Sequence, residues 1–332
     1  MSATRRPASI GAIALMVITV AGCGPEPNVT SPDSTRASAS PSATALVTTA
    51  PTPSPSATGS YPLLIVRVED ADGLHWYATL PDDPSRRHAI AAPLGAVEMG
   101  PAAPDGTVPL TVGSTLLLAT LHGADLTVER TVDMAAVGVG PGAPACIGPG
   151  PSVAVADTET LALTIVPVTG AAVPVAAQDA LGECAWLADG RLLLSREGDR
   201  LAVADDVTGT IRAVAGGSGR YPSTGGGLLA LVDRSGSALG AARVVVRSGA
   251  LTGTARSGLG APRFTIEPGP NELISRASLS PDGAWLAVEV VLDPDGAGQR
   301  TLRLYGIVGG GAQLAREVAL GPGEQVIVLP AP

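Results

Sequence analysis

A strand-turn-strand motif recurs along the chain and constrains the fold more than any other feature. In its two clearest copies, at 184–194 and 277–288, an apolar segment leads through an Asp-Gly turn into a second apolar segment. Asp can bond the nearby backbone and Gly accepts a positive φ, so the pair suits a turn between antiparallel strands. With the more degenerate copies, the turn centres fall at 105, 151, 189, 226 and 282, spaced by 46, 38, 37 and 56 residues. Spacings that bracket a repeat of about 40 to 50 residues predict the four-stranded blades of a β-propeller.

A second turn motif follows with a similar period. It occurs at Val168-Thr169-Gly170, Val207-Thr208-Gly209 and Leu251-Thr252-Gly253. Between the turns lie short runs of Val, Leu, Ile and Ala, whereas Gly and Pro recur too often for a helical apolar period. The chain is therefore predicted to be all-β after residue 60.

The turn Ser280-Pro281-Asp282-Gly283, followed by Trp285-Leu286-Ala287-Val288, resembles the repeats of TolB-like and WD40-like (PD40-type) β-propellers, particularly the former. This resemblance covers most of residues 61–332, with two sharp copies. It implies a propeller domain that binds another protein or a component of the cell wall.

The blade count follows from where the turns fall. Five blades contain a visible turn, and a sixth can be assembled from both ends of the domain, with strands at 63–68, 74–80 and 87–90 and an innermost strand at 325–329. Such a closure removes the free edges of the ring. We predict six blades, with seven as one alternative and a set of unrelated β-sandwich domains as another.

The N-terminus has the order of a bacterial lipoprotein export signal. Arg5 and Arg6 precede the apolar run 10–20, which is too short to span a bilayer, and the sequence Val20-Ala21-Gly22-Cys23 follows. We predict a signal peptide over 1–22, lipidation of Cys23 and anchoring of the chain to the extracytoplasmic face of the cell membrane. An ordinary signal peptide followed by a chance cysteine is the alternative. Two or three acyl chains would suffice to hold the protein on the lipid bilayer.

Residues 23–60 are predicted to be a disordered linker that begins at the lipidated cysteine. From residue 24 they are Ser, Thr, Pro and Ala almost throughout and lack the bulky apolar residues that a core requires. Its reach lies between about 35 Å as a coil and about 115 Å as an extended polyproline helix. The predicted domains are therefore 1–22, 23–60 and, for the propeller, 61–332.

The charge of the chain argues against nucleic acid as a partner. The net charge is −9, and all 21 basic residues are Arg without basic clusters. Binding to phosphates requires a patch of Lys or Arg.

Two cysteines remain besides Cys23. Cys146 and Cys184 each lie five residues before a turn centre, so they occupy the same place in successive repeats. Export permits a disulfide between them. Equivalent positions on neighbouring inner strands could also lie beyond the Cα separation of about 7 Å that a disulfide spans, which would leave two buried thiols.

Motifs for chemistry are sparse. His75, His88 and His122 have no metal-ligand spacing, no Gly-x-Ser-x-Gly elbow occurs, and Gly138–Gly142 has the composition of a turn. The acidic pairs at 82–83, 205–206 and 293–295 suit surface turns, and the matched Trp186 and Trp285 suit the core between blades. No catalytic residue, metal or cofactor is predicted.

Two function classes follow. The first is a non-catalytic binding or scaffold module for an envelope protein or wall component. The alternative is a six-bladed-propeller enzyme, a metal-dependent lactonase or a glycan-processing hydrolase, with its site at the central channel. An enzyme would gather Asp, Glu, Asn or His at the channel mouth, whereas a binding module would line it with Gly, Ala and Ser. The polar residues nearest the inner-strand motifs are Glu183, Arg220, Glu272 and Arg276.

Overall fold

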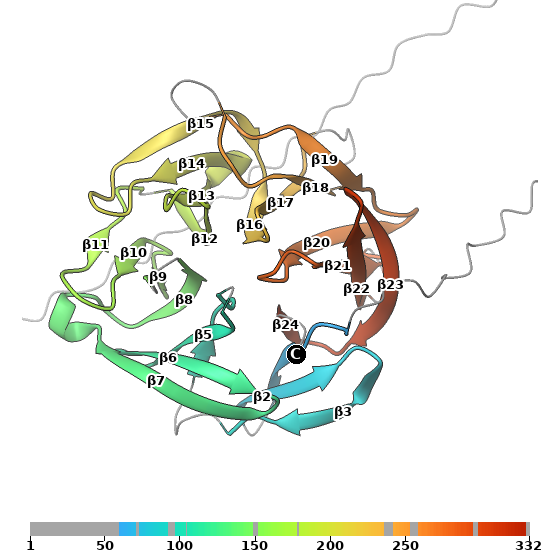
Figure 1. The fold of residues 1–332 in the computed structure, drawn as a ribbon, viewed down its shortest axis with the longest axis horizontal. Coiled ribbons are helices and arrows are strands. Elements are labelled where there is room, and N and C mark those ends of the chain that lie inside the picture. Colours follow the sequence, from blue (N-terminus) through green and yellow to red (C-terminus); the bar gives the residue numbers. More distant parts are fainter. Residues whose placement is uncertain are drawn as a thin grey trace, which may run out of the picture. The chain divides into compact units, whose positions relative to one another are not determined.

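The computed structural model describes residues 60–70, 73–91, 97–103, 105–148, 152–177, 179–235, 242–252, 258–294 and 298–329. Within them the chain forms six four-stranded antiparallel sheets arranged in a ring (Figure 1). This is a six-bladed β-propeller, as the turn spacing predicts. The helical segments among the described residues are two short 3-10 turns, Ala135–Val137 and Glu197–Asp199.

We number the blades along the chain and give their strands from the channel outward. Blade I consists of β24 (Gln325–Val328), β1 (Leu64–Asp70), β2 (Gly73–Leu80) and β3 (Asp83–Ala89). Blade II consists of β4 (Val97–Met99), β5 (Thr107–Val112), β6 (Thr115–His122) and β7 (Asp125–Asp133). Blade III consists of β8 (Gly142–Ile147), β9 (Val153–Asp157), β10 (Leu163–Val166) and β11 (Val173–Pro174).

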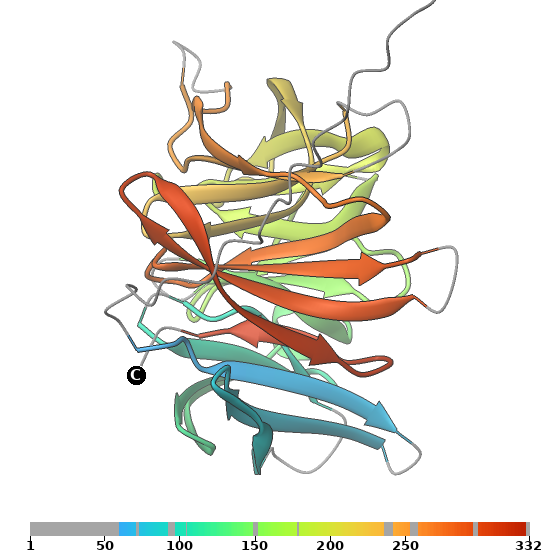
Figure 2. The same ribbon diagram turned by 90° about the vertical axis from the view of Figure 1, so that its right-hand side faces the viewer.

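The remaining three blades follow the same order without interruption. Blade IV consists of β12 (Ala180–Trp186), β13 (Leu192–Arg196), β14 (Arg200–Ala204) and β15 (Ile211–Ser218). Blade V consists of β16 (Arg220–Gly225), β17 (Leu228–Asp233), β18 (Arg243–Ser248) and β19 (Pro262–Ile266). Blade VI consists of β20 (Glu272–Leu279), β21 (Trp285–Leu292), β22 (Gln299–Val308) and β23 (Gly311–Leu320). The strong twist of such a sheet is visible in the orange and red blade VI from the side (Figure 2).

The ring closes through blade I, which takes strands from both ends of the domain. β24 pairs antiparallel with β1, from Leu64 opposite Val328 to Arg67 opposite Gln325. The innermost strand of this blade therefore comes from the C-terminal end, as predicted. This pairing joins the two ends of the domain within one blade and covers the inner edge of β1.

The turns that carry the sequence repeat join the inner strand of a blade to its second strand. In three of them the Asp accepts a hydrogen bond from the N–H two residues later, as Asp105 does from Thr107 at 2.9 Å and Asp282 from Ala284 at 3.1 Å. The Gly that follows has a positive φ, +83° at Gly106 and +71° at Gly283. The Asp-Gly pair thus recurs in the sequence because the backbone of each turn requires these two residue types.

The core lies between the blades. Six clusters of buried apolar residues occur among the described residues, one at each boundary between neighbouring blades. Second strands such as β13 and β17 are buried on both faces, because each sheet is covered on both sides. Trp186 lies in the cluster between blades III and IV and Trp285 in the cluster between blades VI and I, as the matched positions predict.

Candidate functional site

Two connected cavities lie where the six inner strands meet at the axis of the ring. Their volumes are about 260 Å³ and 340 Å³. Most of the residues that line them belong to the six inner strands or to the segments that follow those strands. The two cavities share the wall residues Pro101, Cys184, Pro222, Ser223, Ser278 and Ile327, so together they form one central channel.

The smaller cavity, which we call the apolar end, lies where the inner strands run into their turns. Small and apolar residues line it, including Ala102, Ile147, Leu187, Gly226 and Leu279. The indole of Trp186 packs so closely on Gly148 that a Cβ there would lie 2.5 Å from the ring. Gly, Ala and larger apolar residues thus make up most of this lining.

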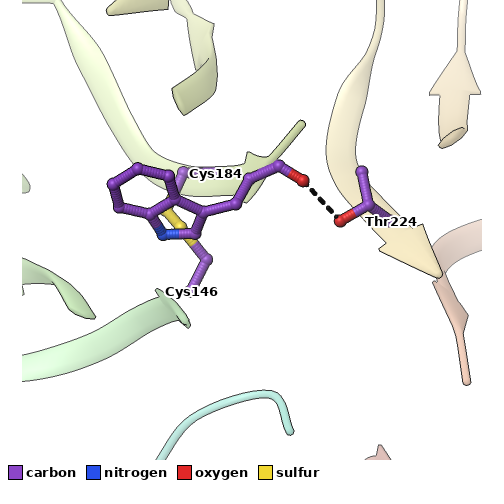
Figure 3. Close-up of a disulfide and its surroundings, with 4 residues drawn as sticks. Cys146, Cys184 and Thr224 are labelled. Atoms are coloured by element: carbon purple, nitrogen blue, oxygen red, sulfur yellow. Dashed lines mark hydrogen bonds between the residues drawn. A yellow bond between two sulfur atoms is a disulfide. The ribbon is translucent and has the colours of Figure 1, made fainter. Parts of the chain in front are cut away.

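A disulfide joins the inner strands of blades III and IV beside this end of the channel (Figure 3). Cys146 on β8 and Cys184 on β12 have Cα atoms 5.8 Å apart, within the separation of about 7 Å that a disulfide spans. Of the two alternatives that the sequence left open, the structure thus has the disulfide. The next boundary is bridged by a hydrogen bond, because the Thr224 hydroxyl on β16 donates to the carbonyl of Trp186 at 2.8 Å. Covalent and polar links thus tie three successive inner strands together.

The larger cavity opens among polar side chains, and we call it the polar mouth. Its polar wall residues include Glu98, Glu183, Tyr221, Arg276 and Gln325. They come from five inner strands, β4, β12, β16, β20 and β24. Of the residue types expected of an enzyme, the two glutamates Glu98 and Glu183 lie in this wall, and no Asp, Asn or His is among the described residues that line either cavity.

Each carboxylate of the polar mouth is paired with an arginine. Arg220 Nε donates to both oxygens of Glu183 at 3.1 Å, its Nη2 forms an ion pair with the same group, and the Tyr221 N–H donates to it at 2.9 Å. The Glu183 hydrogen bond raises the pKa of Arg220. Arg67 pairs with Glu98 at 3.2 Å. Both carboxylates of this wall are thus engaged by guanidinium groups.

Tyr221 has an unusual backbone and an unusual environment. Its φ is +51°, a conformation that favours glycine. The guanidinium carbons of Arg220 and Arg276 lie 5.2 Å and 5.3 Å from the centre of its ring, within the range of cation-π contacts. Arg276 is exposed and forms no ion pair with any residue that the structure describes.

The structure brings together three of the four polar residues singled out from the sequence. Glu183, Arg220 and Arg276 meet at or beside the polar mouth. Glu272 does not, since two hydrogen bonds from Arg303 on β22, at 2.6 Å and 2.7 Å, hold it within its own blade. Those bonds lower the pKa of Glu272. The sequence did not single out Tyr221, Glu98 or Gln325, because nothing local marks them.

The remaining candidate residues lie elsewhere. Cys23, the signal and nearly all of the linker fall outside the described residues, as does Asp295 of the third acidic pair. Asp205 caps its hairpin by accepting hydrogen bonds from the N–H groups of Val207 and Thr208, which is turn chemistry. In the part of the chain that the structure covers, no three His, Cys, Asp or Glu side chains gather as metal ligands. No helix there is long and apolar enough to cross a membrane.

No family model matches the chain, and no curated protein matches it. Solved structures do. The β-propeller domain of Cps50 (Swd1) from Myceliophteria thermophila is 13% identical, with a TM-score of 0.48 over 80% of this chain and 87% of that one. A putative 6-phosphogluconolactonase from Bacteroides uniformis is 13% identical, with a TM-score of 0.44 over 78% of this chain and 83% of that one. At such similarity these matches bear on neither partner nor activity.

Proposed function

We propose that the chain is a lipoprotein anchored through Cys23 on the extracytoplasmic face of the membrane, and that its propeller is a non-catalytic module that binds an envelope protein or a wall component. The TolB-like character of the Ser280-Pro281-Asp282-Gly283 repeat and the export signal support this combination. In this proposal the 23–60 segment is the tether that lets the propeller reach its partner.

The observation that carries the proposal is the pairing at the polar mouth. Glu98 and Glu183 are each paired with an arginine, whereas Arg276 and the Tyr221 ring remain available on the wall. Aromatic and arginine side chains are enriched among residues that dominate binding energy. A channel built in this way offers recognition groups on a scaffold that the closed ring holds rigid.

The test is chemical crosslinking in cells of the full-length protein, with Cys23→Ala as the matched control. Metabolic labelling with a palmitate analogue first establishes whether Cys23 is acylated, since the label should appear in the wild type and be absent from the variant. Crosslinked products are then identified by mass spectrometry. We expect one membrane or wall component to be captured by the anchored protein and lost with the unanchored one.

Equal labelling of the wild type and Cys23→Ala would contradict the anchor. Capture of no specific component, together with turnover of a lactone or a glycan by the purified propeller, would contradict the binding role. That second result would make the channel the site of the six-bladed-propeller enzyme that sequence alone left as the alternative.

A further inference from the structure

We propose that the polar mouth binds a peptide carboxylate, with the guanidinium of Arg276, held against the Tyr221 ring, as the group that recognises it. This inference rests on the proposed binding function and specifies its ligand. The ligand is the carboxylate end of a short chain of small residues. A protein C-terminus and a peptide of the cell wall share this chemistry.

Charge pairing leaves Arg276 as the available cation of the mouth. Among the described residues, three arginines lie at or beside the mouth: Arg67, Arg220 and Arg276. Arg67 is neutralised by Glu98 and Glu69, and Arg220 by Glu183. Arg276 contacts the Tyr221 ring and has no carboxylate partner among those residues. It is exposed and lies in the cavity wall. An anionic ligand can therefore bind it without displacing an existing ion pair.

Tyr221 supplies the second observation. The inner strands β12 and β16 both bulge before their regular pairing resumes, at Cys184 and Ser223. Two residues before those points, β12 has Gly182 with a φ of +69° and β16 has Tyr221 with a φ of +51°. Glycine fits this conformation freely, whereas tyrosine is unfavourable there. A strained aromatic at the cavity wall, stacked on the unpaired guanidinium, indicates that its ring positions Arg276 for a ligand.

The rest of the mouth favours a carboxylate over a larger anion. A single guanidinium fork matches the two oxygens of one carboxylate. Glu98, whose side chain is 42% exposed, lies in the same wall and shares the guanidinium of Arg67 with Glu69. Its charge is therefore only partly compensated and would repel a doubly charged phosphate more strongly than a carboxylate. The exposed amide of Gln325, on the inner strand of the neighbouring blade I, offers a further hydrogen-bond donor in the same wall.

The deeper wall defines what can follow the carboxylate. It is built from small and apolar residues such as Ala145, Pro144 and Pro222, and it continues into the apolar end of the channel. A volume of about 340 Å³ lies in the range of ligand sites. Such a wall suits a short chain of small apolar residues better than a sugar, whose hydroxyls would lose their hydrogen bonds to water.

The test is a titration of the full chain followed by NMR of the arginine Nε–Hε resonances. The probes are N-acetyl-trialanine with a free carboxylate and the same peptide as its C-terminal amide. We expect the Arg276 signal to shift in a saturable way at millimolar free acid and the amide to bind roughly tenfold more weakly or not at all. Absence of a shift with the free acid, or equal affinity for acid and amide, would overturn the proposal.

Three variants make the assignment specific. Arg276→Gln should abolish binding of the free acid, and Arg276→Lys should weaken it because the charge remains but the fork is lost. Arg263→Gln, which removes an exposed arginine from the outer strand β19, should leave binding unchanged. Unchanged binding by Arg276→Gln, in a variant whose backbone spectrum shows that it is folded, would overturn the proposal.

Peptides ending in L-alanine or in D-alanine distinguish the two sources. A preference for the L form indicates a protein C-terminus, and a preference for the D form indicates a wall peptide. Failure of the carboxylate site can be told apart from failure of the proposed binding function. Capture of a partner in cells without an Arg276 response would leave the binding module standing and remove its carboxylate site.

Discussion

Cys184 follows Cys146 by 38 residues and is bonded to it across the boundary between blades III and IV. Closing a loop of this length restricts the unfolded chain, which in the chain-entropy model corresponds to about 4 kcal/mol. We therefore expect the double variant Cys146→Ala/Cys184→Ala to lose about 2 to 4 kcal/mol in urea unfolding. Reductant should lower the stability of the wild type and not that of the variant. An identical response of both proteins to reductant would contradict the bond.

Gly209, in the second turn motif, lies against blade III. Its φ is +66°, and a Cβ there would approach the carbonyl oxygen of Pro174 to 2.0 Å. Gly123 has the same φ with open space around it, so Gly123→Ala isolates the backbone cost, about 1 to 2 kcal/mol. Gly209→Ala should lower the free energy of unfolding, measured in urea, by about 1 to 3 kcal/mol more than Gly123→Ala does, because the new methyl group forces blades III and IV apart locally. Equal losses in the two variants would contradict this contact.

Acid should weaken the fold partly through Glu272. The hydrogen bonds from Arg303 hold the pKa of Glu272 below its ordinary value of 4.5, so the folded state releases this proton more readily than the unfolded state. The contribution of this ion pair to the free energy of unfolding is therefore complete above about pH 4.5. It is lost as the pH falls through the lowered pKa that Glu272 has in the folded state. Glu272→Gln should flatten the dependence of unfolding free energy on pH below 4.5. Glu159→Gln, a change at an exposed position, is the control and should follow the wild type.

Ring closure can be tested by shortening the chain. A chain that ends at Glu324 lacks β24 and the buried side chains of Val328 and Leu329, each worth about 1.5 to 3 kcal/mol. It should unfold at a clearly lower temperature, because β1 loses its partner and blade I its innermost strand. A chain that ends at Leu329 keeps the strand and should match the full protein. Similar melting of both shortened chains would argue against closure through β24.

The fold was largely predictable because its repeat is local. An Asp that accepts the N–H two residues later and a Gly with positive φ leave a mark in adjacent residues, as at Asp282 and Gly283. All five turn centres fall between an inner strand and the second strand of its blade. The closure by residues 325–329 was predictable because one blade lacked a strand and the C-terminal end supplied a spare one.

The polar mouth was less predictable because its residues meet across blades. One usable signal existed, since neighbouring inner strands place residues about one repeat apart side by side. Glu183 and Arg220 are 37 residues apart, and Trp186 and Thr224 are 38 apart, like the two cysteines. The positive φ of Tyr221 and its stacking with Arg276 arise from a bulge and from a contact between blades V and VI. No local pattern in the sequence encodes either.

Photocrosslinking in cells shows whether a partner binds at the polar mouth. A photoreactive amino acid is placed at Gln325, exposed in the wall of the mouth, and in a matched protein at Val207, which is 75% exposed in an outer hairpin. We predict that the Gln325 probe captures one envelope component and that the Val207 probe does not. Capture of the same component from Val207 alone, or equally from both positions, would contradict binding at the mouth.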